Sequence, residues 1–447
     1  MRKAVPSKRV RWPQGWKKSL WVIPGLGLVI KFIIIAQVPG NGWLGADGEN
    51  YLKGLEFLIR DGFLSEESIL HYWPAGYPLL MWILGTLTPT LTVPIMAVLQ
   101  SVLYAFSTAF FTQKLSDSTL RRFSLPAALI LTVSPTLALN TIAIGYELIS
   151  ASSFLLALGL FISLSKVVDP RPWDWRILLI GVIFSFNNFV QPRFLLSSVI
   201  LFSLLAIFLF KRRSWVVVVL VGLILSLLLP SVLIARNILA NDFSAVSTNL
   251  GKAFQLGAGE DATGAYVPSY QGLDCPTVDG NAAEVDQALV RCTISWYLDN
   301  PSQMFRLAFN KSLYFWSPWF GPLANGSMAR NPWLKIHPFY DLATQTQEGY
   351  DLVYGPLGKA VSWIWFSLYI GFAIYGAVIL WRRGGLERNL AIIVSTLILV
   401  NWFISLGTLG DHRQRLPILS IILFLQIIGL SSVRFTSKKT KNRKKRS

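Results

Sequence analysis

The chain has 447 residues, of which 53% are hydrophobic and only 14% are charged, with a net charge of +18 at pH 7. Soluble domains carry about 25% charged residues, so this composition, with a mean hydropathy of +0.49, excludes an ordinary soluble protein. Apolar runs of about 18 or more residues recur along the chain, as in membrane-spanning helices, whose backbone groups are satisfied internally. We therefore predict an all-α polytopic membrane protein.

About ten apolar segments are predicted to span the membrane. The first, 20–38, is followed by no small-residue cleavage motif, so we expect it to be retained rather than removed as a signal peptide. A shorter apolar stretch, 77–88, is bounded by Pro78 and Pro89 and is expected to be a juxtamembrane or re-entrant helix. The other predicted spans are 92–113, 123–140, 148–165, 177–192, 194–210, 214–234, 361–381, 390–408 and 415–432.

Basic residues gather at both ends of the chain, with seven before the first span and eight within 434–447. Lys and Arg collect on cytoplasmic flanks, where anionic lipid attracts them, so we interpret both ends as topology anchors and expect no nucleic-acid partner. Both termini are then cytoplasmic, and an even number of crossings follows. The segments predicted on that same side are 114–122, 166–176, 211–213 and 382–388, and each carries Lys or Arg.

The predicted organisation has four parts. They are an N-terminal transmembrane bundle, 1–236, with its first outer loop at 39–76; an extracytoplasmic loop, 237–360; C-terminal transmembrane helices, 361–433; and a basic cytoplasmic tail, 434–447. The loop 237–360 contains eleven of the 23 acidic residues, which fits an outer location.

Two helices are predicted in the long loop, near 283–299 and 301–316. Asn281 with Glu284 three residues later is a weak capping-box pattern at the start of the first helix. The two cysteines of the chain, Cys275 and Cys292, both lie in this loop. If the loop is extracytoplasmic they could form a disulfide, although the sequence does not give their separation.

Acidic residues in the outer segments are candidates for chemistry. An apolar stripe between Asn50 and Arg60 predicts an interfacial helix, with Asp47 and Glu49 at its N-terminal end, where the helix dipole favours a carboxylate. Asp47 is either a helix cap or a catalytic group. Glu147 directly precedes a predicted span, and it is either an interfacial anchor beside Tyr146 or part of a site.

Four arginines lie on the outer side, against the positive-inside trend: Arg193, Arg236, Arg413 and Arg415. Each could be a snorkelling residue that pairs with lipid headgroups. Guanidinium groups also present planar donors suited to phosphate. Because the four occur together with outer acids, we interpret them as a cradle for a lipid-linked phosphate.

The ordered series of these motifs resembles the polyprenyl-phosphate-dependent C-type (GT-C) glycosyltransferases, which include protein O-mannosyltransferases and lipid A aminoarabinose transferases. The resemblance covers most of the chain. The matching segments are Asp47 with Tyr51, Pro74 to Pro78 with Tyr77, Ser134-Pro135 followed by Tyr146-Glu147, Gln191-Pro192-Arg193, Arg236-Asn237, and Asp411-His412-Arg413-Gln414-Arg415-Leu416-Pro417. Many relatives have adjacent Asp-Glu in the first loop, whereas this chain has Asp47-Gly48-Glu49.

The resemblance implies a GT-C-like fold and an integral membrane glycosyltransferase. Such an enzyme would move a sugar from a polyprenyl-phosphate donor to a hydroxyl of a glycan, lipid or protein acceptor, with inversion, at the outer face of the plasma (inner) membrane. Asp47, Glu147 and Glu49 are then the catalytic candidates. His412 joins the four arginines at the lipid phosphate, while Tyr51 and Tyr77 position donor or acceptor. Two acids and a phosphate could hold a divalent metal, but no ligand set demands one.

Two other functions stay open. A transporter or flippase of a lipid-linked saccharide would also use outer-face arginines. Transporters are expected to carry ionisable residues near mid-membrane and often inverted repeats, and we find neither signal in the sequence. A non-catalytic membrane scaffold would leave the clustering of outer acids and arginines without an explanation.

Overall fold

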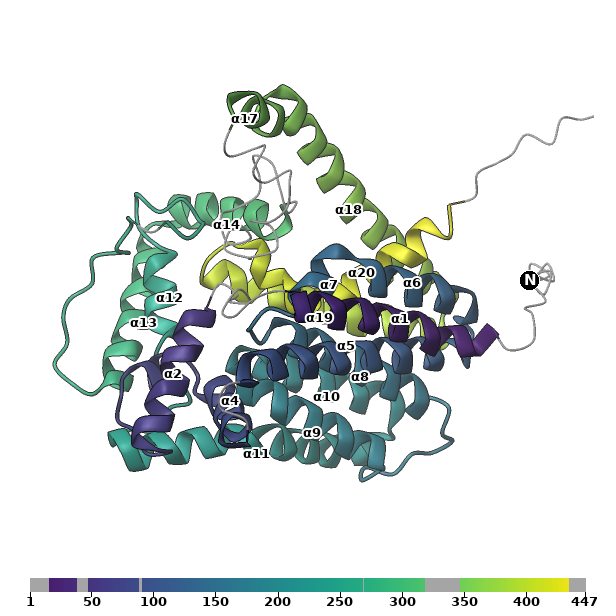
Figure 1. Cartoon of the computed structure of the whole chain (residues 1–447), viewed down its shortest axis with the longest axis horizontal. Helices are drawn as coiled ribbons and strands as arrows, with labels where there is room; N and C mark the ends of the chain where they lie inside the picture. Colours follow the sequence, from purple (N-terminus) through teal and green to yellow (C-terminus); the bar gives the residue numbers. More distant parts are fainter. Residues whose placement is uncertain (1–15, 38–46, 88–90, 268, 318–345, 434–447) are drawn as a thin grey trace, which may run out of the picture.

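The computed structural model describes residues 16–37, 47–87, 91–267, 269–317 and 346–433, which form helices joined by loops, with no strand assigned among them (Figure 1). Parts of the predicted first outer loop and long loop, and all of the basic tail, lie outside these ranges. The four-part division of the chain therefore stays a prediction.

Eight helices in the described residues are long and apolar enough to cross a membrane. This confirms the prediction of an all-α polytopic membrane protein. Three of the eight spans begin with a 3-10 turn, because η3 (Pro192–Phe194), η4 (Arg212–Ser214) and η6 (His412–Arg415) run directly into the helix that follows. The eight helices are α1 (Trp16–Gln37), α5 (Thr92–Ser116), α8 (Glu147–Leu164), α10 (Leu195–Leu209), α11 (Trp215–Asn241), α18 (Pro356–Arg383), α19 (Gly385–Gly407) and α20 (Leu416–Leu430).

The remaining two predicted spans are helical but differ from the expectation. The predicted span 177–192 corresponds to α9 (Trp175–Val190), whose 16 residues extend roughly 24 Å, somewhat less than a hydrocarbon core of about 30 Å. The predicted span 123–140 is not one helix. The helical segment follows η2 (Arg121–Phe123) and divides at Ser134 into α6 (Ser124–Val133) and α7 (Pro135–Asn140). The helix is interrupted because Pro135 has no N–H to donate to a carbonyl in the preceding turn.

The central helices of the bundle are α8 and α20. In their apolar windows 89% and 78% of the residues are buried, against 17% in α1 and in α18, which are therefore peripheral. Serines and glycines let the helices approach closely. A side chain at Gly376 of α18 would meet the backbone of Leu425 in α20 at 1.9 Å, so only glycine fits this crossing.

The two ends of the bundle differ (Figure 1). At one end, on the left of the figure, lie several helices that connect the spans; we call it the loop end. They are α2 (Gly48–Asp61), α3 (Ile69–Tyr72), α4 (Gly76–Leu87), α12 (Leu250–Leu256), α13 (Ala282–Asp299) and α14 (Pro301–Trp316), while α17 (Gln347–Tyr354) lies beyond the start of α18. The opposite, basic end holds short connections with ion pairs such as Lys17–Asp117, with 2.7 Å between Nζ and Oδ1.

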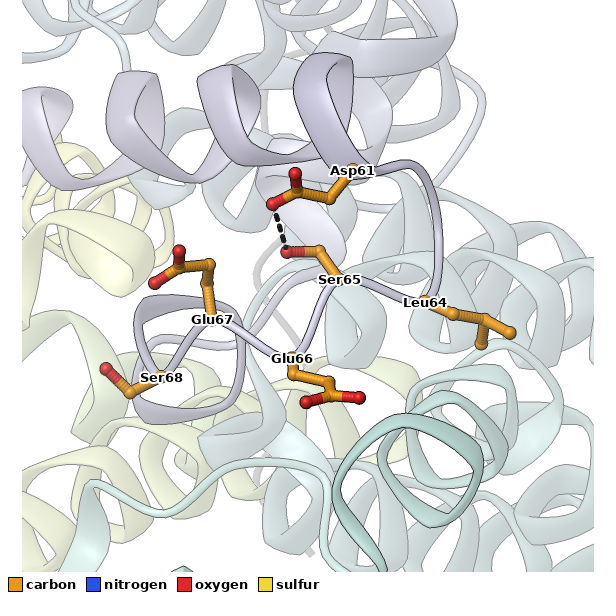
Figure 2. Close-up of a pocket in the computed structure, with 6 residues that line it drawn as sticks. All are labelled: Asp61, Leu64, Ser65, Glu66, Glu67 and Ser68. Carbon is orange, nitrogen blue, oxygen red and sulfur yellow. Dashed lines mark hydrogen bonds between the residues drawn. The ribbon is translucent and has the colours of Figure 1, made fainter.

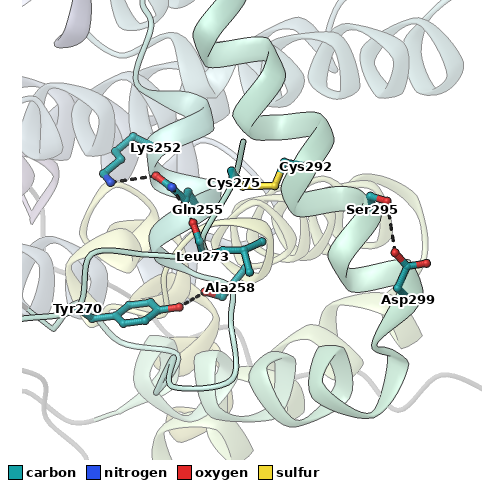
Figure 3. Close-up of a disulfide and its surroundings, with 9 residues drawn as sticks. All are labelled: Lys252, Gln255, Ala258, Tyr270, Leu273, Cys275, Cys292, Ser295 and Asp299. Carbon is teal, nitrogen blue, oxygen red and sulfur yellow. Dashed lines mark hydrogen bonds between the residues drawn. A yellow bond between two sulfur atoms is a disulfide. The ribbon is translucent and has the colours of Figure 1, made fainter. Parts of the chain in front are cut away.

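The described part of the long loop contains the two helices that the sequence predicts. Helices α13 and α14 match the expected ranges, and Asn281 forms a complete capping box in which its side chain accepts from the Glu284 amide and the Glu284 carboxylate accepts from Asn281. A disulfide joins Cys275 to Cys292 and fastens the preceding loop to α13, which confirms that possibility (Figure 3).

Candidate functional site

Three segments far apart in the sequence meet at the loop end through one guanidinium group. Arg413 donates from Nε to Oε1 of Glu147 at 2.6 Å and from Nη2 to Oδ2 of Asp47. Asp47 precedes α2, Glu147 opens α8, and Arg413 lies in η6. All three side chains are less than a fifth exposed, which strengthens their charge–charge contacts relative to open water. We call these three residues the Arg413 cluster.

Asp47 occupies the N-cap position of α2 but does not act as a side-chain cap. No side-chain capping bond forms, and only its backbone carbonyl accepts from the Tyr51 amide, at 3.1 Å. Its carboxylate contacts Arg413 instead. The simpler interpretation, in which Asp47 only caps a helix, therefore does not describe this carboxylate.

Glu147 is held by the turn that precedes α8. An added Cβ at Gly145 would stand 2.3 Å from Oε2 of Glu147, so the carboxylate occupies space that only a glycine leaves open. The Gly145 amide donates to the Tyr77 hydroxyl at 3.1 Å, and that hydroxyl donates to Gln100 Oε1 at 3.2 Å. Gln100 in turn donates to the carbonyl of Ala143 at 3.0 Å. These bonds fix the turn that presents Glu147.

Tyrosine rings line the cluster. Tyr51 and Tyr77 are buried with ring centroids 4.7 Å apart, which places both predicted positioning tyrosines side by side. Burial raises the pKa of Tyr51 well above its ordinary value, and the charges of Asp47 and Glu147 add to this effect. Burial likewise raises the pKa of Tyr146. These hydroxyls therefore stay protonated at neutral pH and can donate hydrogen bonds.

Arg193 lies next to the cluster across one aromatic ring. Its Cζ is 5.4 Å from the centroid of Tyr146, and the Cζ of Arg413 is 6.0 Å from that same centroid. Arg193 donates to the carbonyl of Gln414 at 3.2 Å and is half-buried. Its Nε has no protein acceptor, and no carboxylate pairs with it in the part of the chain that the structure describes. Arg193 thus brings a positive charge that the surrounding described residues do not neutralise.

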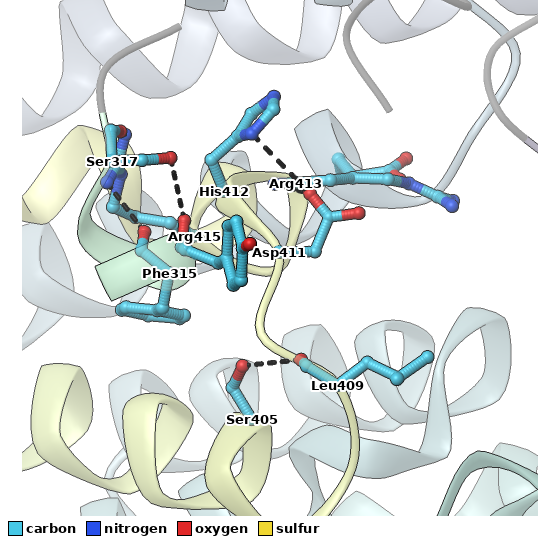
Figure 4. Close-up of polar contacts among 10 residues, drawn as sticks. Phe315, Ser317, Ser405, Leu409, Asp411, His412, Arg413 and Arg415 are labelled. Carbon is cyan, nitrogen blue, oxygen red and sulfur yellow. Dashed lines mark hydrogen bonds and ion pairs between the residues drawn. The ribbon is translucent and has the colours of Figure 1, made fainter. Parts of the chain in front are cut away.

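Arg236 and Arg415 lie outside the Arg413 cluster, because their guanidinium groups donate hydrogen bonds to backbone carbonyls instead. Arg236 is fully buried and donates to the carbonyls of Phe63, at 3.1 Å, and Ser65. Arg415 donates to the carbonyls of Phe315 and Ser317 at 2.6 and 2.8 Å. Figure 4 shows Arg415 and Arg413 on opposite sides of the same turn.

Two further predicted site residues, His412 and Glu49, lie outside the Arg413 cluster. His412 is fully buried, with Nδ1 3.7 Å from Oδ1 of Asp411, whose carboxylate also accepts from the backbone amide of Arg413 at 2.8 Å. Glu49 is exposed in the first turn of α2 and does not contact Arg413. The structure therefore joins Asp47 and Glu147 but not Glu49.

A divalent metal does not fit this arrangement of the acids. Asp47 and Glu147 would be the ligands, and each already gives an oxygen to Arg413, whose positive charge lies between them. Among the described residues, no group of three or more His, Cys, Asp or Glu side chains is placed to hold a metal.

An acidic depression lies elsewhere at the loop end, after α2. It is lined by Asp61, Leu64, Ser65, Glu66, Glu67 and Ser68 (Figure 2). None of these residues belongs to the Arg413 cluster. Its hydrogen bond from Ser65 to Asp61, at 3.2 Å, holds the connection between α2 and α3.

Several residues of interest were missed in the sequence. Gln100 was detectable as an amide within an apolar span. Lys31 is a second case, because it lies within the first predicted span, 20–38, as a charged residue among apolar ones. It lies six residues before the end of α1, only 4% exposed, with Nζ 4.8 Å from the ring centroid of Tyr104.

Comparison with known proteins gives a likeness among solved structures. No family model and no curated protein matches the chain. Among solved structures, it is similar to the archaeal oligosaccharyltransferase AglB from Archaeoglobus fulgidus, solved in complex with an inhibitory peptide and a dolichol-phosphate. The TM-score is 0.46 and the identity 14% over 94% of this chain, which spans 50% of that protein. A likeness at this level assigns neither a reaction nor a substrate to this chain.

Proposed function

We propose that this protein is a membrane glycosyltransferase that moves a sugar from a polyprenyl-phosphate carrier to a hydroxyl acceptor at the loop end of the bundle. The observation that carries the proposal is the Arg413 cluster. Two carboxylates and one guanidinium from distant segments meet at the loop end of the bundle, beside a second arginine, Arg193. A scaffold protein would have no need for such an arrangement of charges.

The proposed reaction needs a base on one side of the sugar and charge stabilisation on the other. Asp47 removes the proton from the acceptor hydroxyl, and the resulting oxygen attacks C1 of the donor sugar. The bond between C1 and the phosphate oxygen breaks, and polyprenyl phosphate leaves with the electron pair. Attack opposite the leaving group inverts the configuration at C1. The leaving phosphate is already a stable anion, so it needs a cation more than a proton.

Arg193 is the arginine best suited to that phosphate. Its charge has no carboxylate partner in the described structure, whereas Arg413 is engaged by two acids. Preorganised donors aimed at developing charge are usually the largest single contribution to catalysis. We assign Arg193 to the donor phosphate, and Arg413 to the orientation of Asp47 and Glu147.

The proposed orientation places the loop end outside the cell, with both termini in the cytoplasm and the protein in the plasma membrane. The basic connections at the opposite end follow the positive-inside rule. The disulfide at the loop end also favours this orientation, because disulfides persist in oxidising compartments.

Transport of a lipid-linked saccharide remains the second candidate, and Lys31 is the observation that favours it. A buried lysine within a span is typical of a substrate or ion pathway. The two functions differ in what they consume. A transferase breaks the sugar–phosphate bond of the donor, whereas a transporter returns the donor intact on the other side of a vesicle.

Replacement of Asp47 tests the transferase. Asp47→Asn keeps the size of the side chain but removes its charge, and loss of a positioned base slows a reaction by about a hundred- to ten-thousand-fold. Glu49→Gln is the matched control, because Glu49 is the exposed acid two residues away. The measurement is transfer of labelled sugar from a polyprenyl-phosphate donor by purified protein. Near-normal turnover in Asp47→Asn would remove Asp47 from the mechanism.

A further inference from the structure

The turn that leads into Arg413 is enclosed by the helices of the long loop. The Gly410 amide donates to the carbonyl of Gly264 at 2.8 Å, which ties the turn to the loop after α12. On its other side, an added Cβ at Gly410 would stand 2.4 Å from Cα of Lys311, so α14 lies directly against the turn. We call the segment 406–411 the Arg413 turn.

Lys311 is the buried polar residue at this contact. Its side chain is fully buried, and Nζ donates to the carbonyl of Leu406 and to the hydroxyl of Tyr297, both at 2.9 Å. That hydroxyl donates to the carbonyl of Gly257 at 2.8 Å. One amine therefore connects α14, α13, the end of α12 and the end of α19.

The packing around Lys311 leaves no room for displacement. An added Cβ at Gly257 would stand 1.8 Å from the carbonyl oxygen of Thr408 and 2.9 Å from Nζ of Lys311. Arg415 secures the other side of η6 by its bonds to the carbonyls of Phe315 and Ser317 at the end of α14. Arg413 is thus held on both sides, by the Arg413 turn before it and by the bonds of Arg415 after it.

We propose that Lys311 is a positioning residue, which fixes the Arg413 turn so that Arg413 reaches Asp47 and Glu147 together. The inference rests on the proposed function for its catalytic consequence, but the contact itself can be tested without activity. Lys311 does not touch the Arg413 cluster. It acts through the backbone of the turn, so α14 contributes to the position of Arg413.

The experiment replaces Lys311 with Met, which preserves the length of the chain but removes both donors. Lys252→Met is the matched control. Lys252 lies on α12 and also makes two hydrogen bonds of 2.9 Å, to Gln255 and to the carbonyl of Gln271, but neither partner belongs to the Arg413 turn. Hydrogen exchange is measured on the amides of 408–414, with those of α8 as an internal reference.

In Lys311→Met we expect exchange at 408–414 to accelerate at least about tenfold while α8 and the Lys252→Met variant are unchanged. In the transfer assay, kcat should fall about ten- to hundredfold, as for small misplacements of catalytic groups, with KM for the donor changed less than about twofold. Unchanged exchange would overturn the contact, and faster exchange with normal kcat would overturn the positioning role. A wild-type protein without transfer activity would instead refute the proposed function and leave the exchange test intact.

Gly410→Ala provides a second test should Lys311→Met fail to fold. The added methyl group pushes the turn away from α14 while Lys311 keeps its amine. Gly371→Ala in α18 is the matched glycine control, since a methyl group there meets nothing within 4 Å. The same loss of kcat and the same gain in exchange are expected for Gly410→Ala, and wild-type values for both would contradict the inference.

Discussion

Arginine side chains at the loop end divide by what their guanidinium groups contact. Arg236 and Arg415 donate to backbone carbonyls, Arg413 to two carboxylates, and Arg193 to a single carbonyl. A guanidinium enclosed by carbonyls holds a loop in place and has few donors left for a ligand. The sequence could indicate that all four lie at the same boundary, but not this division, which depends on contacts between residues up to 366 positions apart.

Replacement of Arg193 and Arg236 separates binding from folding. Removing a charge-assisted hydrogen bond costs about 1.5–3 kcal/mol, or roughly ten- to hundredfold in affinity. We expect Arg193→Gln to raise KM for the donor by that factor with little change in thermal stability. Arg236→Gln should lower the unfolding temperature, because the carbonyls of Phe63 and Ser65 lose their donor. Donor titration and thermal unfolding of both variants check this, and an exchange of the two phenotypes would reverse the assignment.

Lys311 should make stability depend on pH. Burial lowers its pKa to about 7 from the ordinary 10.5. Above pH 7 the unfolded chain then binds more protons than the folded protein, so stability rises with pH, by at most about 1.4 kcal/mol per unit. Among the described residues, the titratable group that Lys311 hydrogen-bonds is Tyr297, whose pKa burial raises, so that it stays neutral in this range.

The measurement is the difference in unfolding temperature between wild type and Lys311→Met from about pH 6 to pH 9. The wild type should gain relative to the variant as the pH rises through 7. A difference that stays constant over this range would show that Lys311 keeps the same charge in the folded and unfolded chain.

At the scale of helices, prolines explain where the sequence prediction succeeds and where it fails. Pro230 lies inside α11 without ending it, and the carbonyl of Ser226, which loses its usual donor, accepts from Asn188 at 3.3 Å. Pro135 instead divides the predicted span 123–140. Hydropathy records both segments as continuous, because it does not report which neighbour satisfies the freed carbonyl.

Tyr104 supplies that partner at the break between α6 and α7. Its hydroxyl donates at 2.8 Å to the carbonyl of Leu131, the group that Pro135 cannot serve. An unsatisfied buried carbonyl costs about 1–3 kcal/mol, so Tyr104→Phe should lower thermal stability by that amount. Tyr375→Phe, at a 44% exposed position of α18, is the control and should have almost no effect. Equal stability of the two variants in detergent would show that the bond contributes nothing.

Considered as a whole, the molecule separates its charges along the axis of the bundle. The sequence alone predicted this asymmetry, and also the helices α13 and α14 with the capping box of Asn281. It could not predict that the Arg413 turn and α14 meet. This contact depends on Gly257, Gly410 and Lys311, whose positions follow no periodic pattern in the sequence. The candidate site was therefore predicted as separate acids and arginines, and only the fold indicates which of them touch.

The orientation in the membrane is the prediction on which the proposed site depends. Ser302→Cys places a thiol at an exposed position of α14, and Val168→Cys places one at the basic end, where Val168 is 93% exposed. The native cysteines are joined to each other and do not compete for the label. With an impermeant maleimide on intact cells, Ser302→Cys should react at once, whereas Val168→Cys should react only after permeabilisation. The opposite pattern would place the Arg413 cluster in the cytoplasm. The basic connections of the other end could then not be cytoplasmic anchors, and a carrier presented on the outer face could not reach Arg193.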